Sequence, residues 1–326
     1  MKSKKPIVLV VKTVYERVKT VFEEISDFEI VPAPTEEMAL VEIVREKDPI
    51  AVVLNVDPYT GPLYDALQKG RLIARYGVGC DNIDFKKAAE NGLYVTNTPG
   101  VLEATVAEFT VFLMGEVLRM PGLSTHDMKE GHWNQRMGRE LRGKTCAILG
   151  LGAIGKKVSQ ILSFGFDVTV LALKKTIENP EELKEKYGVQ KASTEFSEIA
   201  PRADIISLHL PANEETHHYM DKPRLQQLKR GSVLINTGRG ALVDENALYD
   251  ALKKNHISAA GLDVYQHEPY KPLDPQKDLR DLENVVLTPH IGSSTGECSR
   301  RMAERVIQNI RLWVKGEHNQ MDVVSG

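Results

Sequence analysis

The stretch Cys146-Ala-Ile-Leu-Gly-Leu-Gly-Ala-Ile-Gly-Lys-Lys-Val158 decides the fold of this chain. It begins as an apolar run typical of a buried strand, turns at glycines spaced GxGxxG, and continues as a helical pattern to Phe164. Gly150 permits the tight turn, Gly152 lets the main chain approach a pyrophosphate, and Gly155 lets the helix pack against the strand. The stretch therefore predicts a Rossmann βα unit whose helix N-terminus holds an anionic dinucleotide.

Strand-like runs alternate with helical stretches on both sides of this unit, which indicates an α/β protein with parallel sheets covered on both faces. The first series of expected strands is Ile7–Val11, Glu29–Val31, Ile50–Leu54, Leu72–Tyr76 and Tyr94–Thr96. The second series starts at Thr145 and continues with Val168–Leu171, Ile205–Leu208, Val233–Asn236, Ala259–Val264 and Val285–Leu287. Two series of this kind predict two doubly wound domains.

The break between the two series sets the predicted domain boundaries. The turn Asn97-Thr-Pro-Gly100 interrupts the alternation, and a long helix at about 296–315 follows after the second series has used all its strands. We expect that helix to pack on the first domain. A discontinuous domain of residues 1–100 plus 292–326 and a dinucleotide-binding domain of residues 101–291 are therefore predicted.

The composition excludes several classes of protein. With 326 residues, 42% hydrophobic and 27% charged, the chain is an ordinary globular protein, and its net charge of −3 predicts no binding to nucleic acid. The apolar run Ile7–Val11 near the N-terminus is too short for a membrane span or a signal sequence, and no membrane association is expected. Cys80, Cys146 and Cys298 lie far apart without metal-ligand spacing, so we expect reduced thiols, no metal and a cytoplasmic location.

Three polar residues follow the ends of late strands, where open α/β sheets bind their ligands. Arg239 follows Leu234-Ile-Asn-Thr-Gly238, Glu268 lies in Gly261-Leu-Asp-Val-Tyr-Gln-His-Glu-Pro269, and His290 lies in Leu287-Thr-Pro-His-Ile-Gly-Ser293. With these motifs in this order, the chain resembles the D-isomer-specific 2-hydroxyacid dehydrogenases from about Leu72 to His290. The resemblance implies a Rossmann domain, a flavodoxin-like substrate domain and hydride transfer between a nicotinamide and a small 2-keto or 2-hydroxy acid.

The chemistry of that reaction explains the three residue types. A planar Arg239 guanidinium can clamp a substrate carboxylate or 2-oxygen with two hydrogen bonds. His290 can give a proton to the carbonyl oxygen and take it back in the oxidative direction. Glu268, bonded to the other ring nitrogen, would orient the imidazole and stabilise its cation.

The resemblance also assigns residues to the two ligands. Asp263 is expected to hold the nicotinamide carboxamide, and Thr237 and Gly238 to touch the cofactor from beneath. The full set of expected dinucleotide contacts is Gly150, Gly152, Ala153, Ile154, Gly155, Leu173, Lys174, Lys175, Leu210, Pro211, Thr237, Gly238, Arg239, Asp263, His290 and Gly292. The expected substrate contacts are Arg75, the main-chain N–H groups of Val78 and Gly79, Arg239 and His290.

The residues at the end of the second Rossmann strand bear on whether the coenzyme carries a 2′-phosphate, that is, whether it is NADP or NAD. A carboxylate about 20 residues after the glycine turn usually binds the ribose hydroxyls, but Leu173 stands there, followed by Lys174 and Lys175. Without a carboxylate at this position, nothing there repels the 2′-phosphate of NADP, and the two lysine ammonium groups could bind it. The sequence therefore favours NADP, with NAD as the alternative.

The sequence leaves open which 2-keto or 2-hydroxy acid is the substrate, and it also leaves open a function other than catalysis. The local sequence motifs resemble those of glyoxylate or hydroxypyruvate reductases and also those of 3-phosphoglycerate dehydrogenases. Two features weaken the second resemblance: Asn55 stands where the phosphoglycerate type tends to have an arginine, and no regulatory domain is expected after residue 326. Glu268 argues against a formate dehydrogenase, which would have glutamine. A dinucleotide-sensing, corepressor-like binding protein of the same fold remains the alternative to an enzyme.

The helix expected at Glu103–Leu118 predicts a homodimer formed through the dinucleotide domain. It has more apolar residues than a single core-facing stripe of a helix would contain, so part of its surface is expected to be covered by a second chain. These apolar residues are Val106, Phe109, Val111, Phe112, Leu113 and Val117.

Overall fold

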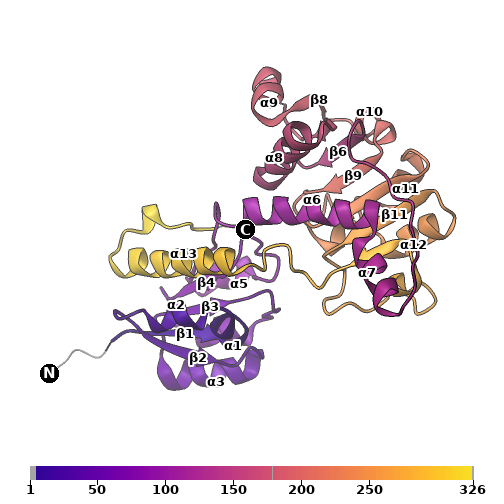
Figure 1. Ribbon diagram of the computed structural model, residues 1–326. Coiled ribbons are helices and arrows are strands. Elements are labelled where there is room, and N and C mark those ends of the chain that lie inside the picture. The colour runs from indigo at the N-terminus through magenta and orange to yellow at the C-terminus, as the bar shows by residue number, and fades with distance from the viewer. Residues whose placement is uncertain (1–4, 178, 325–326) are drawn as a thin grey trace. The chain divides into compact units, whose positions relative to one another are not determined.

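The computed structural model describes residues 5–177 and 179–324 (Figure 1). The chain divides into two compact units. Unit 1 comprises Met1–Leu102 and Ser294–Gly326, and unit 2 comprises Glu103–Ser293. Unit 2 is therefore one continuous segment inserted between two parts of unit 1.

Unit 1 contains a five-stranded parallel sheet in the order β2-β1-β3-β4-β5. Its strands are β1 (Ile7–Val11), β2 (Glu29–Ala33), β3 (Ala51–Leu54), β4 (Leu72–Arg75) and β5 (Tyr94–Thr96). Strand order 2-1-3-4-5 is that of flavodoxin-like folds, whose ligands bind beyond the carboxyl ends of the strands.

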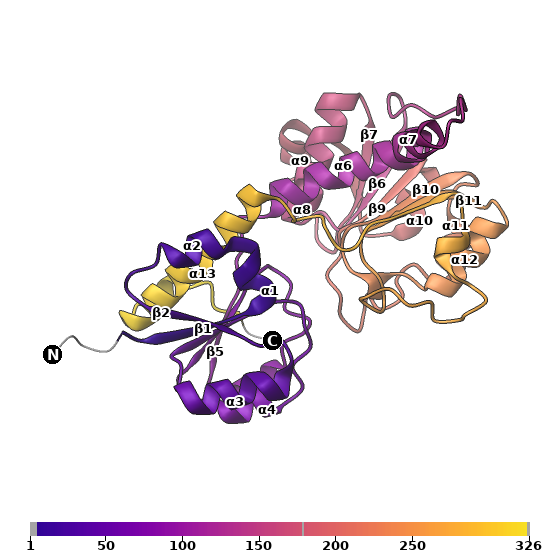
Figure 2. The same cartoon turned by 60° about the horizontal axis from the view of Figure 1, so that its bottom comes forward.

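Helices cover both faces of the unit 1 sheet. They are α1 (Lys12–Tyr15), α2 (Lys19–Glu23), α3 (Glu37–Lys47), α4 (Pro62–Ala66), α5 (Phe85–Glu90) and α13 (Gly296–Val314). Helix α13 packs against β4 and α2 and buries Met302, Val306 and Ile310, while α3 and α4 lie on the opposite face (Figure 2). The helices α1 and α2 are separate, because the backbone of Val18 leaves the helical region at φ −136° and ψ 36°.

Unit 2 contains a seven-stranded parallel sheet in the order β12-β11-β10-β9-β6-β7-β8. Its strands are β6 (Thr145–Leu149), β7 (Thr169–Leu173), β8 (Val189–Ser193), β9 (Ile205–Leu208), β10 (Ser232–Asn236), β11 (Ile257–Leu262) and β12 (Val285–Leu287). The order reverses between β6 and β9, as in Rossmann folds, which places the dinucleotide crevice there. The predicted α/β class with two doubly wound sheets is confirmed.

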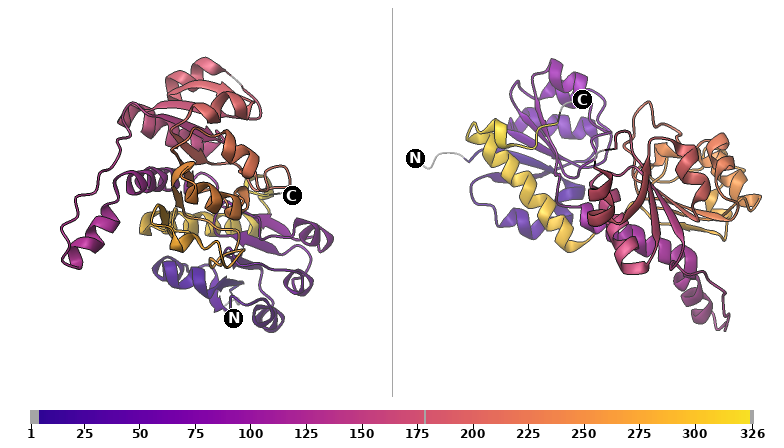
Figure 3. Two further views of the ribbon diagram at one scale, coloured as in Figure 1. Left: turned by 90° about the vertical axis from the view of Figure 1, so that its right-hand side faces the viewer. Right: turned by 90° about the horizontal axis from the view of Figure 1, so that it is seen from above.

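The core of unit 2 lies on both sides of this sheet. Ala147 and Leu149 enter one apolar cluster, whereas Cys146 and Ile148 enter the other, so β6 is buried on both faces. Helices cover the two faces: α6 (Glu103–Arg119), α8 (Ala153–Gln160), α9 (Pro180–Tyr187), α10 (Phe196–Ile199), α11 (Lys222–Gln227) and α12 (Glu245–Lys253). Helix α7 (Pro121–Lys129) and the segment that returns from it to β6 project from the rest of unit 2 (Figure 3).

Within residues 5–177 and 179–324, no helix combines the length and the apolar character that crossing a membrane requires.

Candidate active site

The glycine turn after β6 has the shape that a pyrophosphate needs. Gly150 adopts φ +101°, and a Cβ there would lie 2.5 Å from the main chain of His209. A Cβ on Gly155 would lie 2.2 Å from the carbonyl oxygen of Gly150, whereas one on Gly152 would meet no heavy atom within 4 Å in the described part of the chain. Gly152 caps α8 without a side-chain hydrogen bond, so the first N–H groups of the helix are available to an anion. These residues fit a dinucleotide.

Other predicted dinucleotide residues lie around this turn. Ala153 and Ile154 begin α8, and Leu210, after β9, has its main-chain nitrogen 2.7 Å from the Cβ position of Gly150. His209 beside it is neutral, because burial lowers its pKa to about 4, and its Nε2 lies 2.8 Å from the hydroxyl of Ser207. Pro211 is exposed.

The end of β7 differs in detail from its predicted role. Leu173 is 5% exposed and belongs to the same core cluster as Leu149, so its side chain points into the protein. Lys174 is half-buried, and Lys175 is exposed and forms a 3.1 Å ion pair with Glu215. The end of β7 therefore carries no carboxylate at position 173. Because the Leu173 side chain is buried, the residues after it, Lys174 and Lys175, are the ones placed to contact a ribose.

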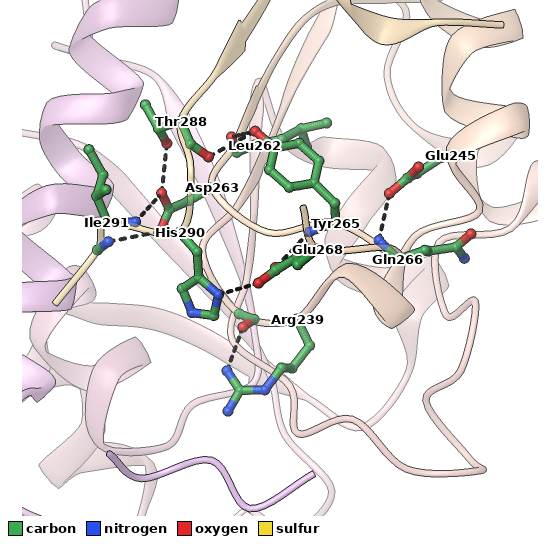
Figure 4. Close-up of polar contacts among 12 residues, drawn as sticks. Arg239, Glu245, Leu262, Asp263, Tyr265, Gln266, Glu268, Thr288, His290 and Ile291 are labelled. Atoms are coloured by element: carbon green, nitrogen blue, oxygen red, sulfur yellow. Dashed lines mark hydrogen bonds and ion pairs between the residues drawn. The ribbon is translucent and has the colours of Figure 1, made fainter. Parts of the chain in front are cut away.

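Asp263 holds the loop that carries His290. Its buried carboxylate accepts hydrogen bonds from the hydroxyl of Thr288 at 2.7 Å and from the main-chain N–H groups of Ile291 and Gly292 at 2.8 Å (Figure 4). Burial raises the pKa of Asp263 against these hydrogen bonds. His290 adopts φ +52°, and its N–H donates to the carbonyl oxygens of Asp263 and Thr288. The hydrogen bonds of Asp263 thus hold His290 in a backbone conformation that is unfavourable for a residue other than glycine.

His290 and Glu268 form a hydrogen-bonded pair. Nδ1 of His290 lies 2.7 Å from Oε2 of Glu268, and the other carboxylate oxygen accepts the N–H of Tyr265 at 3.1 Å. Burial opposes ionisation of Glu268, but the hydrogen bond and charge of His290, the Tyr265 N–H and Arg239 hold its pKa below the usual value. An ionised partner requires the proton on Nδ1, which leaves Nε2 to exchange a proton with a ligand.

Arg239 lies beside this pair at the end of β10 (Figure 4). Its Nη1 donates to the carbonyl oxygen of Gly238 at 2.7 Å. The side chain of Asn236 spans the turn, because it accepts the N–H of Gly238 at 3.0 Å and donates to the carbonyl oxygen of Arg239 at 2.8 Å. The hydroxyl of Thr237 lies 2.8 Å from that of Thr110 in α6. The three predicted catalytic residues therefore meet at the carboxyl ends of β10, β11 and β12.

Unit 1 carries the other predicted substrate residues in the loop after β4. Within residues 5–177 and 179–324, the main-chain N–H groups of Val78 and Gly79 have no hydrogen-bond acceptor. Arg75 is 5% exposed, donates Nη1 to the carbonyl oxygen of Tyr76, and would lie 2.8 Å from a Cβ on Gly77. The guanidinium thus supports the loop from beneath.

Several residues that shape the site were not predicted from the sequence. Asn236, Thr288 and Tyr265 each hold a turn that carries a catalytic candidate. The available signal was their position directly beside a strand end. Asp263 was assigned to the nicotinamide, but its carboxylate also serves the His290 loop.

Comparison with known proteins agrees with this geometry. Residues 111–292 match the NAD binding domain of the D-isomer specific 2-hydroxyacid dehydrogenases. A glyoxylate reductase of Korarchaeum cryptofilum is 37% identical over 321 residues, covering 96% of this chain and 94% of that protein. A D-3-phosphoglycerate dehydrogenase of Methanocaldococcus jannaschii is 34% identical over 95% of this chain and 58% of that protein.

A solved structure extends the match to both units. An NADPH-dependent glyoxylate/hydroxypyruvate reductase from Sinorhizobium meliloti, in complex with NADP and malonate, has a TM-score of 0.82 and 29% identity over 95% of this chain and 94% of that one. Sequence, fold and the strand-end residues agree, and the protein belongs to the D-isomer specific 2-hydroxyacid dehydrogenase family, as a nicotinamide-dependent oxidoreductase that acts on the CH–OH group of 2-hydroxy acids.

Proposed function

We propose that the protein reduces small 2-keto acids of the glyoxylate and hydroxypyruvate type, with Arg239, Glu268 and His290 as the catalytic residues. The observation that carries this proposal is the 2.7 Å contact between His290 and Glu268 beside Arg239. The nicotinamide, when bound, supplies or accepts the hydride. Nε2 of His290 protonates the substrate oxygen, and Glu268 stabilises the imidazolium before that transfer. Arg239 orients the substrate by two parallel hydrogen bonds.

The substrate carboxylate is assigned to the unit 1 loop. Two adjacent N–H groups without an internal acceptor, those of Val78 and Gly79, are suited to an anion. Arg75 adds positive charge below them without reaching the surface. Burial of this arginine, together with Asn55 at the end of β3, favours a substrate with one anionic group over a phosphorylated one.

NADPH is the proposed coenzyme. The support is Leu173 in place of a ribose-binding carboxylate, the two lysines after it, and the NADPH-dependent relative. The ion pair between Lys175 and Glu215 weakens the attraction for a 2′-phosphate, so we expect a modest preference.

A cytoplasmic location is part of the proposal, supported by Cys80, Cys146 and Cys298, which form no disulfide within residues 5–177 and 179–324. We also propose a homodimer formed through unit 2. Helix α6 buries most of its apolar residues within its own unit, but Phe112 on it is 65% exposed. Met128, Trp133 and Met137, on α7 and the projecting segment after it, are 54%, 76% and 94% exposed. These four residues are the apolar surface proposed for a second copy of the chain.

Turnover tests the proposed function. The purified protein is mixed with NADPH or NADH and with glyoxylate, hydroxypyruvate, phenylpyruvate or phosphorylated hydroxypyruvate, and coenzyme absorbance is followed. Glyoxylate and hydroxypyruvate should give the highest kcat/KM, and His290→Ala should lower kcat by about 10²–10⁴-fold. Near wild-type turnover in His290→Ala would sink the mechanism. Tight coenzyme binding without turnover of any acid would favour the dinucleotide-sensing alternative.

A further inference from the structure

Two segments of unit 2 that carry catalytic candidates are joined main chain to main chain. One runs from Arg239 into α12, and the other runs from β11 to Glu268. A Cβ on Gly240 would lie 1.9 Å from the carbonyl carbon of Tyr265 and 2.5 Å from the nitrogen of Gln266. The contact is closer than any side chain would allow, so these two segments hold a fixed register.

Glu245, the first residue of α12, adds a hydrogen bond to this contact. It is 5% exposed, and its Oε1 accepts the main-chain N–H of Gln266 at 2.8 Å (Figure 4). Its Oε2 is buried without a hydrogen-bond partner among residues 5–177 and 179–324. Capping of α12 is done instead by Asp244, which accepts the N–H of Ala247 at 3.0 Å. The helix therefore does not require the Glu245 carboxylate as its cap.

A buried carboxyl group with one unpaired oxygen is unfavourable. Burial raises the pKa of Glu245, the Gln266 N–H and His267 act in the opposite direction, and Asp244 adds to the rise. Tyr265 and Tyr270 are the other titratable groups that interact with it. The hydrogen bond from the Gln266 N–H offsets part of this cost and ties the buried carboxylate to the segment that leads to Glu268.

Gln266 is held from two sides. Its main chain donates to Glu245, and its side-chain Nε2 donates to the carbonyl oxygen of Val243 at 3.0 Å and contacts Nε2 of His218. The turn that follows is closed by the N–H of Tyr265, which donates to Glu268 at 3.1 Å. Fixing Gln266 therefore fixes the turn from which the Glu268 carboxylate reaches His290.

We propose that Glu245 is a positioning residue, which through Gln266 places the carboxylate of Glu268 against Nδ1 of His290. This inference rests on the proposed role of the Glu268–His290 pair. Glu245 touches neither the substrate nor the coenzyme in this scheme, so its loss should act on kcat rather than on coenzyme affinity.

The experiment compares Glu245→Ala, Glu245→Asp and Glu245→Gln with Glu268→Ala and the double variant Glu245→Ala/Glu268→Ala. Asp250→Ala is the matched control, since Asp250 is a carboxylate of the same helix that pairs with Lys277 at 2.8 Å, away from this contact. Turnover against pH, KM for the keto acid, Kd for NADPH and Tm are measured for each.

Glu245→Ala and Glu245→Asp should lower kcat about ten- to a hundredfold, since small misplacements of a catalytic group have effects of that size. Their pH profiles should move toward that of Glu268→Ala, while Kd for NADPH stays unchanged. Glu245→Gln, which can still accept the Gln266 N–H, should stay within about threefold of wild type. In the Glu268→Ala background, Glu245→Ala should cause no further loss of kcat, and Asp250→Ala should leave kcat unchanged.

Equal losses of kcat in the two backgrounds would show that Glu245 acts elsewhere and would overturn the inference. An unaltered pH profile with a lowered Tm would do the same, since it indicates a purely structural residue. If Glu245→Ala does not fold, the comparison of Asp with Gln decides, and equal activities of these two variants would reject the inference. Unchanged kcat in Glu268→Ala alone would instead refute the proposed function.

Discussion

At the scale of single residues, the site depends on a histidine held in a conformation it does not favour. A non-glycine residue with positive φ costs on the order of 1–3 kcal/mol. Here the three hydrogen bonds of the Asp263 carboxylate keep the residues around His290 in place. Asp263 thus supports the main chain around the proposed acid–base residue, whereas Glu268 contacts its imidazole ring.

Asp263→Asn should separate these functions. An amide nitrogen would replace one acceptor and face an N–H donor of Ile291 or Gly292, so the loop loses a hydrogen bond. We expect kcat to fall about ten- to a hundredfold with a lowered Tm, measured by steady-state kinetics and calorimetry. The exposed Asp281→Asn, in the turn before β12, is the control. Wild-type kcat in the Asp263 variant would show that the loop does not depend on this carboxylate.

Glu268→Gln should reveal the charge of the pair. The substitution keeps a hydrogen bond to His290 but removes the negative charge that stabilises the imidazolium, so the limb of the pH–rate profile that reports the imidazolium should move to lower pH. The loss of kcat should be smaller than in Glu268→Ala. An unchanged profile would count against a charged pair.

The same variant tests stability against pH. The pKa of Glu268 is lower in the folded protein than in the unfolded chain, so its contribution is present above the unfolded value of about 4.3 and is lost as pH falls through the folded value. The part of the difference in Tm between wild type and Glu268→Gln that comes from the Glu268 charge should therefore shrink as pH falls below about 4. A difference that does not shrink there would contradict this assignment.

The catalytic candidates could be predicted because residue type and position after a strand both carry information. Arg239, Glu268 and His290 follow β10, β11 and β12, and the structure brings them together. The residues that hold them could not be predicted in the same way. Asn236 bonds main-chain groups of its own turn, those of Gly238 and Arg239, and nothing in its residue type singles out that role. Thr288 bonds the carboxylate of Asp263, 25 residues earlier in the chain, so that contact depends on three-dimensional folding rather than on any spacing in the sequence.

At the scale of elements, the buried strands were predictable and an edge strand was not. The strands β1, β9 and β12 begin and end where the apolar runs predict. Strand β8 was missed because it lies at the edge of its sheet, where Gln190 and Lys191 are exposed and interrupt the apolar pattern. The same edge borders the proposed phosphate site, since the N–H of Lys174 donates to the carbonyl oxygen of Ser193.

The coenzyme prediction belongs to this edge. Replacing Lys174 and Lys175 by serine should reduce an NADPH preference of about tenfold to near unity by raising KM for NADPH. Lys186→Ser, in α9 and paired with Glu182, is the control for a lost surface charge. Leu173→Asp, the obvious test from the sequence, would bury a carboxylate in the core and would lower stability as well. A parent protein that prefers NADH would refute the role of both lysines.

At the scale of the whole molecule, the apolar content of α6 has a different explanation from the one its sequence suggests. Val106, Val111, Leu113 and Val117 are buried in unit 2, and a Cβ on Gly261 of β11 would lie 2.9 Å from side-chain atoms of Leu113 and Val117. Periodicity alone did not distinguish this internal packing from an interface. The assembly prediction therefore depends on the exposed residues that remain.

Light scattering at micromolar concentration should give the mass of two chains. Phe112→Glu combined with Trp133→Glu should shift the mass toward one chain, because charges would be introduced into the proposed interface. Met38→Glu, an exposed apolar residue of unit 1, is the control and should leave the mass of two chains unchanged. A mass of one chain for the parent protein would refute the homodimer.

The insertion of unit 2 into unit 1 has a consequence for synthesis. Residues 1–102 emerge from the ribosome first. The sheet that they form can be covered by α13 only after unit 2 and then residues 296–314 have been synthesised. At roughly 5–20 residues per second, the face of β4 that α13 covers waits on the order of ten seconds or more. During that interval unit 2 can fold completely, while unit 1 exposes apolar surface. The last helix made is therefore the one that ends the vulnerable period of the nascent chain, and premature termination after unit 2 would release a protein with one finished unit and one that is open to aggregation.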